Sequence, residues 1–430
     1  MRYDPIDYQL FINNRNRFSR YLQPGSLAVF HSNDLMPRTA DQFFPFRQSS
    51  DFFYLTGIDQ ENTILVLAPD FPQQNLREVL FIMKTTPELA TWEGDKLTPD
   101  QAREISGIQN IKWVEDFEDW LPLWMNSIRQ CYLNANEHGR FKSPVISKDL
   151  RYAKDLKEKF PMHTFQRSAP IMHRLRSIKS EQEIGLMKKA CNITHGAFDK
   201  VLDFVKPGVG EYEIEAEITA EFIRNRADGH AYDPIVASGK NACTLHYTHN
   251  NNICRDGDMV LFDFGASWAN YASDMSRIIP VNGRYTDRQK EVYNAVLRTF
   301  KEAKKLLRPG TLLSEYQQEV GKMIEKELIE LKVLSKADVD NQDPSNPLYR
   351  KYFMHGTSHF IGLDTHDVGP KFEPIKEGMA FTVEPGIYLP EEGIGVRLEN
   401  DVIVTDDQPR DLMEDIPIEA EEIEERMNSK

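Results

Sequence analysis

Residues 259–277 read Met259-Val-Leu-Phe-Asp263-Phe-Gly-Ala-Ser-Trp-Ala-Asn-Tyr-Ala-Ser-Asp274-Met-Ser-Arg277. Four apolar residues lead into Asp263, a turn is predicted to follow, and Asp274 is predicted to lie on the return strand. The two carboxylates stand 11 positions apart (274 − 263) and can face the same side of a hairpin. Burying a carboxylate is costly unless a cation or another partner compensates for it. The stretch therefore predicts a buried site rather than two acids that point into solvent.

Around this hairpin, helices and strands are predicted to occur twice in the same order. Lys206-Pro-Gly ends one helix and precedes another, and Arg308-Pro-Gly does the same 102 residues later (308 − 206). Pro and Gly interrupt a helix, and an acidic or Ser-capped turn starts the next one. Two related halves that face each other across a cleft are therefore predicted. Strands are expected at 232–237, 259–264 and 276–281 in the first half, and at 379–383 and 402–404 in the second.

Three capping boxes mark predicted helix starts, namely Ser180 with Glu183, Thr286 with Gln289, and Ser314 with Gln317. Behind Ser180, apolar residues recur at helical spacing, which indicates a long amphipathic helix. The pattern changes just before this helix, so two domains are predicted, at residues 1–175 and 176–430. The length of 430 residues agrees with two domains, because it exceeds what one ordinary core supports.

The N-terminal domain is predicted to be α/β. Short apolar runs at 63–68, 79–83 and 110–114 indicate strands, and 99–105 and 148–160 indicate helices. No catalytic signature is present in this part of the sequence. Its recurrent aromatic residues are expected in the core: Phe43, Phe44, Phe46, Phe52, Phe53 and Tyr54.

Composition excludes several classes of partner. The net charge of −15 argues against nucleic acid, which requires clustered Lys and Arg. No run of about 18 apolar residues is present, so no membrane span is expected. The N-terminus carries acidic residues in place of a signal peptide's apolar stretch, which makes the cytoplasm the expected location. The four cysteines form no CxxC pair and are expected to be reduced thiols. Cys243-Thr-Leu-His246 has no second such pair that would complete a zinc site.

The segment His355-Gly-Thr-Ser-His359-Phe-Ile-Gly-Leu-Asp-Thr-His366 holds three of the chain's 11 histidines within 12 residues. A single histidine is usually structural, but three with interleaved glycines indicate a site, because imidazole can bind metals or carry protons near neutral pH. Two further acids, Glu384 and Glu399, each interrupt an apolar strand-like run. Asp263-Phe-Gly also matches the kinase metal-binding tripeptide, but no glycine-rich loop or His-Arg-Asp segment accompanies it.

Taken together, these segments resemble the pita-bread metallopeptidases, and among them the Xaa-Pro aminopeptidase (aminopeptidase P) family. In the N-terminal domain, Phe46-Arg-Gln-Ser-Ser-Asp51-Phe-Phe-Tyr-Leu-Thr-Gly57 and Thr91-Trp92-Glu-Gly94 are similar to segments of that family. The resemblance implies a C-terminal domain of pseudo-two-fold α+β architecture that binds two metal ions. By resemblance, Asp263 binds one metal, His359 and Glu384 bind the other, and Asp274 and Glu399 bridge both.

The same resemblance implies an aminopeptidase that removes the first residue from peptides with proline in the second position. Four carboxylates and one imidazole suit Mn²⁺ better than a Cys/His zinc site would. Two such ions can hold a hydroxide that attacks the Xaa-Pro bond. The resemblance places His246, His355 and His366 at the substrate and Arg397 in the pocket beyond the cut bond. It also implies a homodimer or homotetramer, in which Trp92 helps to wall the site.

Prolidase, a dipeptidase with the same ligand set, is the nearest alternative. Prolidases commonly carry a longer insertion between the last two glutamates, which here stand 15 positions apart (399 − 384). Methionine aminopeptidases lack the large N-terminal domain, and creatinase-like relatives lack the metal ligands. A metal-free module that only binds peptides is the alternative outside enzymes, and five filled ligand positions argue against it.

Overall fold

A computed structural model describes residues 3–429, which divide into two compact units. The N-terminal unit comprises Tyr3–Arg176, and the C-terminal unit begins at Ser177. Among residues 3–429, no helix combines the length and the apolar character that crossing a membrane requires. All four cysteines are free thiols, and Cys131, Cys191 and Cys254 are buried.

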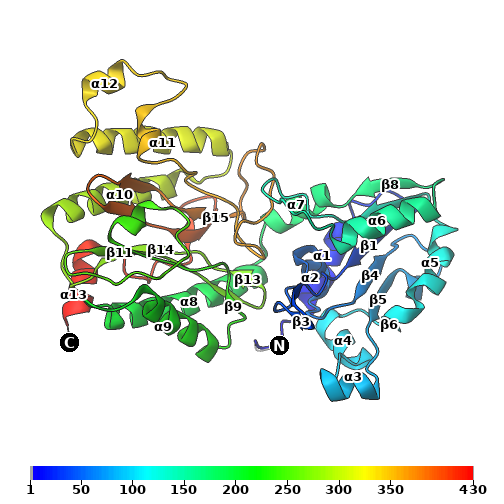
Figure 1. The fold of residues 1–430 in the computed structure, drawn as a ribbon. Coiled ribbons are helices and arrows are strands. Elements are labelled where there is room, and N and C mark those ends of the chain that lie inside the picture. Colours follow the sequence, from blue (N-terminus) through cyan, green and yellow to red (C-terminus); the bar gives the residue numbers. More distant parts are fainter. Residues whose placement is uncertain (1–2, 430) are drawn as a thin grey trace. The chain divides into compact units, whose positions relative to one another are not determined.

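The N-terminal unit is built on a mixed six-stranded sheet in the order β6-β5-β4-β1-β7-β8 (Figure 1). The central strands β1, β4 and β5 pair antiparallel, and β6, β7 and β8 join in parallel. The strands are β1 (Ser26–His31), β4 (Ile64–Leu67), β5 (Glu78–Ile82), β6 (Asn110–Trp113), β7 (Gln130–Leu133) and β8 (Thr164–Arg167). The helices are α1 (Gln9–Ser19), α2 (Ser50–Thr56), α3 (Pro87–Trp92), α4 (Pro99–Ser106), α5 (Phe117–Met125), α6 (Lys148–Lys159) and α7 (Ala169–Ser177).

Apolar side chains of β1, β4 and β5 pack with α5 and α6 into the core of this unit, in which Trp124 and Phe81 are fully buried. The predicted strands and helices of this domain are confirmed within one or two residues. The expectation for the aromatic residues is confirmed for Phe52, Phe53 and Tyr54, and it is wrong for Phe43 and Phe44. The last two lie in and beside the two-stranded ribbon of β2 (Pro37–Thr39) and β3 (Gln42–Phe43), whose residues are all exposed.

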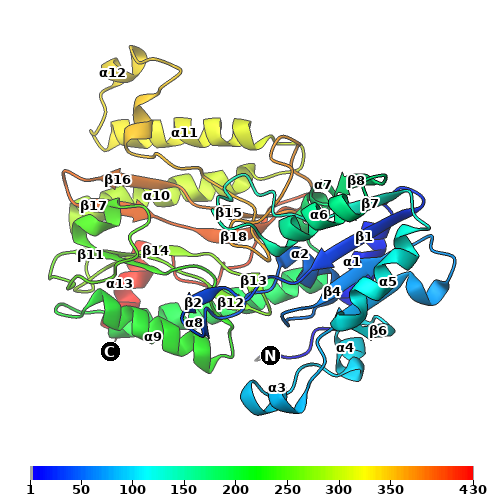
Figure 2. The same ribbon diagram turned by 45° about the vertical axis from the view of Figure 1, so that its right-hand side comes forward.

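In the C-terminal unit, strands lie in a layer between the helix pair α8 and α9 and the helix pair α10 and α11, as Figures 1 and 2 both show. Each pair packs together, and the order of two helices followed by strands occurs twice, as predicted. The helices are α8 (Glu181–Phe204), α9 (Glu211–Arg224), α10 (Asp287–Leu306), α11 (Leu313–Glu330), α12 (Lys336–Asp340) and α13 (Ala420–Asn428).

Two of the small antiparallel sheets of this unit correspond to its two halves. The first has the order β10-β11-β14, and the second has the order β15-β18-β19 beside the hairpin of β16 and β17. Buried Arg277 on β14 links the halves, because its guanidinium donates to the carbonyl of Glu399 (2.8 Å) and to Asn400 Oδ1 (2.8 Å). The strands are β10 (Ile235–Ser238), β11 (Met259–Asp263), β14 (Ser276–Pro280), β15 (Ala380–Val383), β16 (Gly386–Leu389), β17 (Ile394–Arg397), β18 (Asn400–Ile403) and β19 (Arg410–Asp411). A third small sheet is β13 (Tyr271–Ala272), β12 (Ala266–Trp268) and β9 (Gly229–His230).

Two of the three predicted capping boxes are present, at Ser180 and at Thr286. The third is wrong, because α11 begins one residue before Ser314 with Leu312 as its N-cap. The side chain of Gln317 instead accepts from the backbone N–H (2.7 Å) and the hydroxyl (2.9 Å) of Thr357. A tertiary partner therefore replaces the local hydrogen bond of the capping box.

Candidate active site

Asp263 and Asp274 lie together, although the chain between them is not a simple turn. Asp263 ends β11, and Asp274 lies two residues before β14 rather than on it, so that part of the prediction is wrong. The intervening residues form β12 and β13. The backbone at Gly265 and the backbone at Ser273 lie close together, which is possible because Gly265 has no side chain. A Cβ at Gly265 would lie 1.8 Å from the carbonyl oxygen of Ser273.

The predicted ligands of the second half lie at strand ends rather than within strands. Glu384 follows β15, and Glu399 lies between β17 and β18. His359 precedes β15, and its backbone pairs with Thr382, whose N–H donates to the His359 carbonyl at 3.0 Å. This backbone contact spans 23 positions (382 − 359) and holds the His359 segment against β15.

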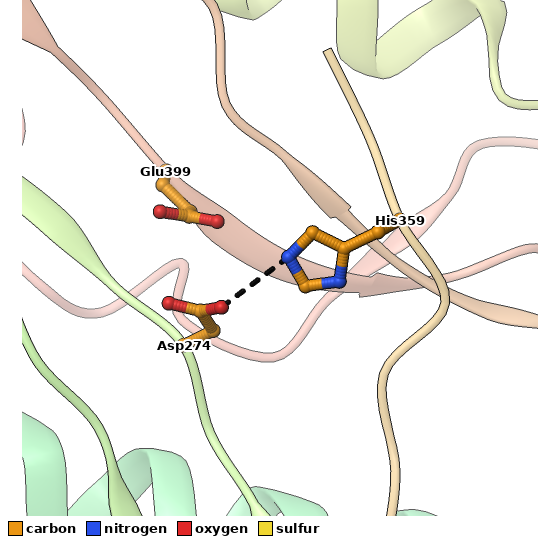
Figure 3. A group of neighbouring side chains, drawn as sticks. All are labelled: Asp274, His359 and Glu399. Carbon is orange, nitrogen blue, oxygen red and sulfur yellow. Dashed lines mark ion pairs between the residues drawn. The ribbon is translucent and has the colours of Figure 1, made fainter. Parts of the chain in front are cut away.

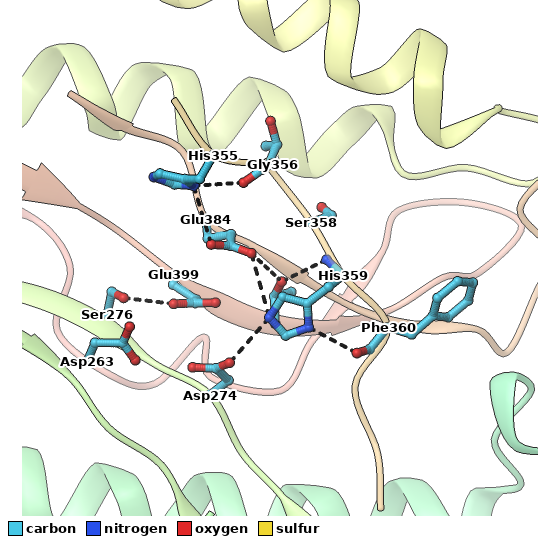
Figure 4. A network of polar contacts seen from close by, with 12 residues as sticks. Asp263, Asp274, Ser276, His355, Gly356, Ser358, His359, Phe360, Glu384 and Glu399 are labelled. Carbon is cyan, nitrogen blue, oxygen red and sulfur yellow. Dashed lines mark hydrogen bonds and ion pairs between the residues drawn. The ribbon is translucent and has the colours of Figure 1, made fainter. Parts of the chain in front are cut away.

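Asp274, His359 and Glu399 form a cluster in which one side-chain ligand atom from each lies within 4.8 Å of the others (Figure 3). Nε2 of His359 lies 3.4 Å from Asp274 Oδ2 and 3.6 Å from Glu384 Oε1. Figure 4 shows Asp263 on the side of Asp274 that is away from His359. The structure thus brings all five predicted metal-ligand positions into one region.

Burial of these carboxylates makes their ionisation unfavourable. Burial is the largest cause, and the charges of neighbouring carboxylates add to it. The pKa of Asp274 and that of Glu399 are raised well above their usual values, and the pKa of Glu384 is raised from 4.5 to about 7. His359 and Arg397 oppose the shift of Glu384. Further positive charge would therefore stabilise the ionised form of these carboxylates.

Tyr232 is a residue of this network that the sequence did not indicate. Its hydroxyl lies 2.6 Å from Asp263 Oδ1 and 2.5 Å from Asp274 Oδ1. The single hydroxyl proton can be donated to only one of these oxygens at a time, so Tyr232 lies between the two carboxylates and contacts both. Tyr232 lies shortly before β10, at the start of the strand predicted for residues 232–237, where an aromatic residue is an ordinary strand residue. No local pattern distinguishes it.

Arg397 and His355 belong to a chain of hydrogen bonds that begins at Asp263. The Arg397 guanidinium donates from Nη2 to Asp263 Oδ2 (2.7 Å), from Nη1 to the Tyr388 hydroxyl (2.8 Å) and from Nε to Ser276 Oγ (2.8 Å). The Tyr388 hydroxyl in turn lies 2.8 Å from His355 Nε2. Burial and the charge of Arg397 lower the pKa of His355 to about 3, so this imidazole is neutral at neutral pH.

The remaining predicted substrate residues lie on exposed segments. His366 packs edge to face against His359, with ring centroids 4.5 Å apart. His246 lies on the segment after the 3₁₀ helix Gly239–Cys243 and is exposed. Ser276, which donates to Glu399 Oε2 at 2.7 Å, is a further residue that the sequence did not indicate.

The donor set fits a pair of divalent cations. Four carboxylates and one imidazole converge, and their oxygen-rich chemistry suits hard divalent ions such as Mn²⁺ and Mg²⁺. Burial, and the mutual repulsion that adds to it, raise the pKa values of Asp274, Glu384 and Glu399, and bound cations would stabilise the ionised carboxylates. Neighbouring hydroxyl groups orient two of these carboxylates. Ser276 donates to Glu399, and the Thr382 hydroxyl donates to Glu384 Oε1 at 3.3 Å.

Comparison with known proteins extends these findings over nearly the whole chain. The model of metallopeptidase family M24 matches residues 185–406, and that of the aminopeptidase P N-terminal domain matches residues 11–132. The chain is 35% identical to the Xaa-Pro aminopeptidase of Escherichia coli over 98% of both sequences. It is 34% identical to the human Xaa-Pro aminopeptidase 3, over 93% of this chain and 80% of that protein.

Solved structures show the same relationship. Zinc-substituted E. coli aminopeptidase P in complex with product superimposes with a TM-score of 0.90 at 33% identity, over 99% of both chains. The same enzyme with the inhibitor Pro-Leu gives a TM-score of 0.89 over the same shares.

Proposed function

The chain belongs to metallopeptidase family M24, and on that premise we propose how this metal-dependent aminopeptidase removes the first residue from Xaa-Pro peptides. The convergence of Asp274, His359 and Glu399 within 4.8 Å, with Asp263 and Glu384 beside them, carries the proposal. The alternative of a metal-free peptide-binding module would leave this costly group of buried acids without a purpose.

We assign the ligand roles as follows. Asp263 would hold one metal, His359 and Glu384 would hold the other, and Asp274 and Glu399 would be shared by both. When bound, such ions supply a hydroxide nucleophile and polarise the scissile carbonyl. Manganese is the proposed physiological metal, supported by the four carboxylates in the set.

The residues around the ligands orient the peptide. His355 is a neutral imidazole fixed between Tyr388 and the carbonyl of Gly356 (2.8 Å), so it acts as a hydrogen-bonding group rather than as a cation. His366 and His246 are exposed, and we assign them to substrate contact and to stabilisation of the tetrahedral intermediate. Proline in the second position lacks an N–H and has a fixed φ, so a dedicated pocket must replace the contacts that a general peptidase uses.

Arg397 supports an aminopeptidase rather than a dipeptidase. A dipeptidase must recognise the carboxylate directly after proline, usually with an arginine. Here all three guanidinium nitrogens of Arg397 donate within the protein, to Asp263, Tyr388 and Ser276. Two of the five guanidinium N–H groups remain, but Arg397 is buried at 4% exposure, so it is poorly placed to capture a substrate carboxylate. The peptide chain beyond proline can therefore continue.

The test is turnover of Ala-Pro-Ala and of Ala-Pro by the Mn²⁺-loaded protein. We expect the tripeptide and longer Xaa-Pro peptides to be cleaved and the dipeptide to be a poor substrate. Gly-Ala-Ala, which lacks proline, serves as the control and should remain uncut. Comparable turnover of Ala-Pro and Ala-Pro-Ala would instead indicate prolidase chemistry at the same metal site.

Location and assembly are further parts of this proposal. A reducing compartment such as the cytoplasm is supported by the four free thiols. A homodimer or homotetramer is supported by Trp92, whose side chain is 82% exposed at the end of α3. Light scattering of the wild-type protein and of Trp92→Ala tests the assembly, and we expect the substitution to weaken it.

A further inference from the structure

A single buried carboxylate lies beneath the loop that carries His246. We define the His246 loop as residues 238–252. Glu211, the first residue of α9, is fully buried, and its Oε1 accepts from the backbone N–H and the hydroxyl of Ser238, both at 2.7 Å. Its Oε2 accepts from the Tyr247 hydroxyl and from the Asn252 N–H, both at 2.8 Å. Asn241 Nδ2 is a further donor to Oε1, at 3.5 Å. All of these donors are neutral, and all belong to the His246 loop.

The next turn of α9 holds the same loop again. Glu215 Oε2 accepts from Asn250 Nδ2 at 2.8 Å, and Asn250 Oδ1 accepts from the Val236 N–H at 2.9 Å. The Asn250 backbone has a φ of +45°, a conformation that a non-glycine residue adopts at a cost and that such contacts help to maintain. The His246 loop is thus fastened to α9 near both of its ends.

We propose that Glu211 is a positioning residue for His246, which it acts on by holding the His246 loop against α9. Tyr247 is the direct neighbour of His246, so its hydroxyl bond to Glu211 fixes the backbone from which the imidazole extends. A carboxylate bonded only by neutral donors is costly to bury and is strongly ordered by them, because charged acceptors form the stronger hydrogen bonds. The inference rests on the proposed role of His246 at the substrate.

The alternative is that Glu211 only stabilises the helix, because an acid in the first turn favours the N-terminus. Glu213 offers a matched control for that effect. It lies in the same turn, is exposed, and accepts from the Gly210 N–H at 2.7 Å, with no hydrogen bond to the His246 loop among those found in the described residues. Both acids contribute to the helix start, but only Glu211 contacts the loop.

The experiment is a double-mutant cycle on Mn²⁺-loaded protein with Ala-Pro-Ala as substrate. The variants are Glu211→Gln, His246→Ala and both together, with Glu213→Gln as the control. We expect Glu211→Gln to lower kcat/KM about tenfold with unchanged metal content, since the amide turns a donor toward existing donors. In the His246→Ala background the same substitution should have no further effect. Glu213→Gln should keep wild-type activity.

Equal losses from Glu211→Gln in both backgrounds, or full activity of that variant, would overturn the inference. If Glu211→Gln does not fold, Tyr247→Phe removes one donor and completes the same cycle. Hydrogen exchange supplies a readout that is independent of activity, and residues 238–252 should exchange faster in Glu211→Gln but not in Glu213→Gln. If residues 238–252 exchange at the wild-type rate in Glu211→Gln, the inference is contradicted, even if the wild-type protein cleaves no Xaa-Pro peptide. Full activity of His246→Ala contradicts only the proposed role of His246.

Discussion

The carboxylates that we assign to the metals and the histidines that we assign to the substrate are held in place by different means. Asp263, Glu384 and Glu399 each stand at the end of a strand, so the hydrogen-bonded register of two small sheets positions them. His246 and His355 lie on loops that a few helix side chains, among them Glu211 and Gln317, fasten to α9 and α11. Substitution of one of these carboxylates is therefore expected to abolish activity. Substitution of a loop histidine, or of a side chain that holds its loop, is expected to lower activity only in part.

The largest effect is expected from neutralising a metal-binding carboxylate. Asp263→Asn, Asp274→Asn and Glu399→Gln should each lower kcat by on the order of 10³-fold or more, because each removes a charge that holds a metal. Circular dichroism should show the fold retained, and metal analysis should show a reduced content. Near wild-type turnover with a full metal complement would contradict the ligand assignment.

The next test separates the two histidines whose rings touch. His359→Ala should lose both metal and activity, whereas His366→Ala should keep its metals and slow turnover about 10²-fold, as expected for loss of a proton-transfer or hydrogen-bonding group. Metal content per chain and kcat, measured on the same preparations, distinguish them. Equal retention of metal by both variants would refute this division of roles.

A smaller effect is expected at the second loop anchor. Gln317→Ala removes the acceptor for both Thr357 bonds next to His355 and should lower kcat/KM about tenfold. Ser314→Ala, in the same turn of α11, is the control and should be silent, because Ser314 caps no helix. If both variants behave alike, the contact with Thr357 has no functional weight.

The smallest effect concerns stability and pH. In metal-free protein the pKa of Glu384 is raised from 4.5 to about 7, so its contribution to stability is present below pH 4.5 and is lost as the pH rises toward 7. Bound metal removes that loss. The difference in Tm between Mn²⁺-loaded and chelator-treated protein should therefore grow from pH 5 to pH 8. A constant difference would indicate that these carboxylates are ionised without metal.

Much of the architecture followed from local patterns. The two-domain α/β organisation is confirmed, and so are the pita-bread C-terminal domain and the aminopeptidase class, which the resemblance to the aminopeptidase P family implied. The acids stood out because each interrupts an apolar run, and the histidines because they are clustered. The roles assigned to Asp263, Asp274, His359, Glu384, Glu399 and the substrate residues remain predictions that the variants above test.

Other features were out of reach for the sequence. Tyr232, Ser276 and Glu211 occupy positions that read as ordinary strand or helix starts, and only their long-range partners reveal them. Gln317 was expected in a capping box, but Thr357, 40 positions away, forms its hydrogen bonds. Similarly, the turn between Asp263 and Asp274 contains two further strands.

By itself, the sequence determined where the helices and strands form and which acids and histidines are available for chemistry. Hydrophobic periodicity, capping residues and acids within apolar runs can be recognised because each involves residues that are close together in the chain. Only the tertiary structure decided which atoms meet. Arg277 and Arg397 join the two halves of the unit through hydrogen bonds that span 121 to 134 positions. The geometry of the site depends on such contacts, and a hydrogen bond's strength depends on distance and burial rather than on separation along the chain.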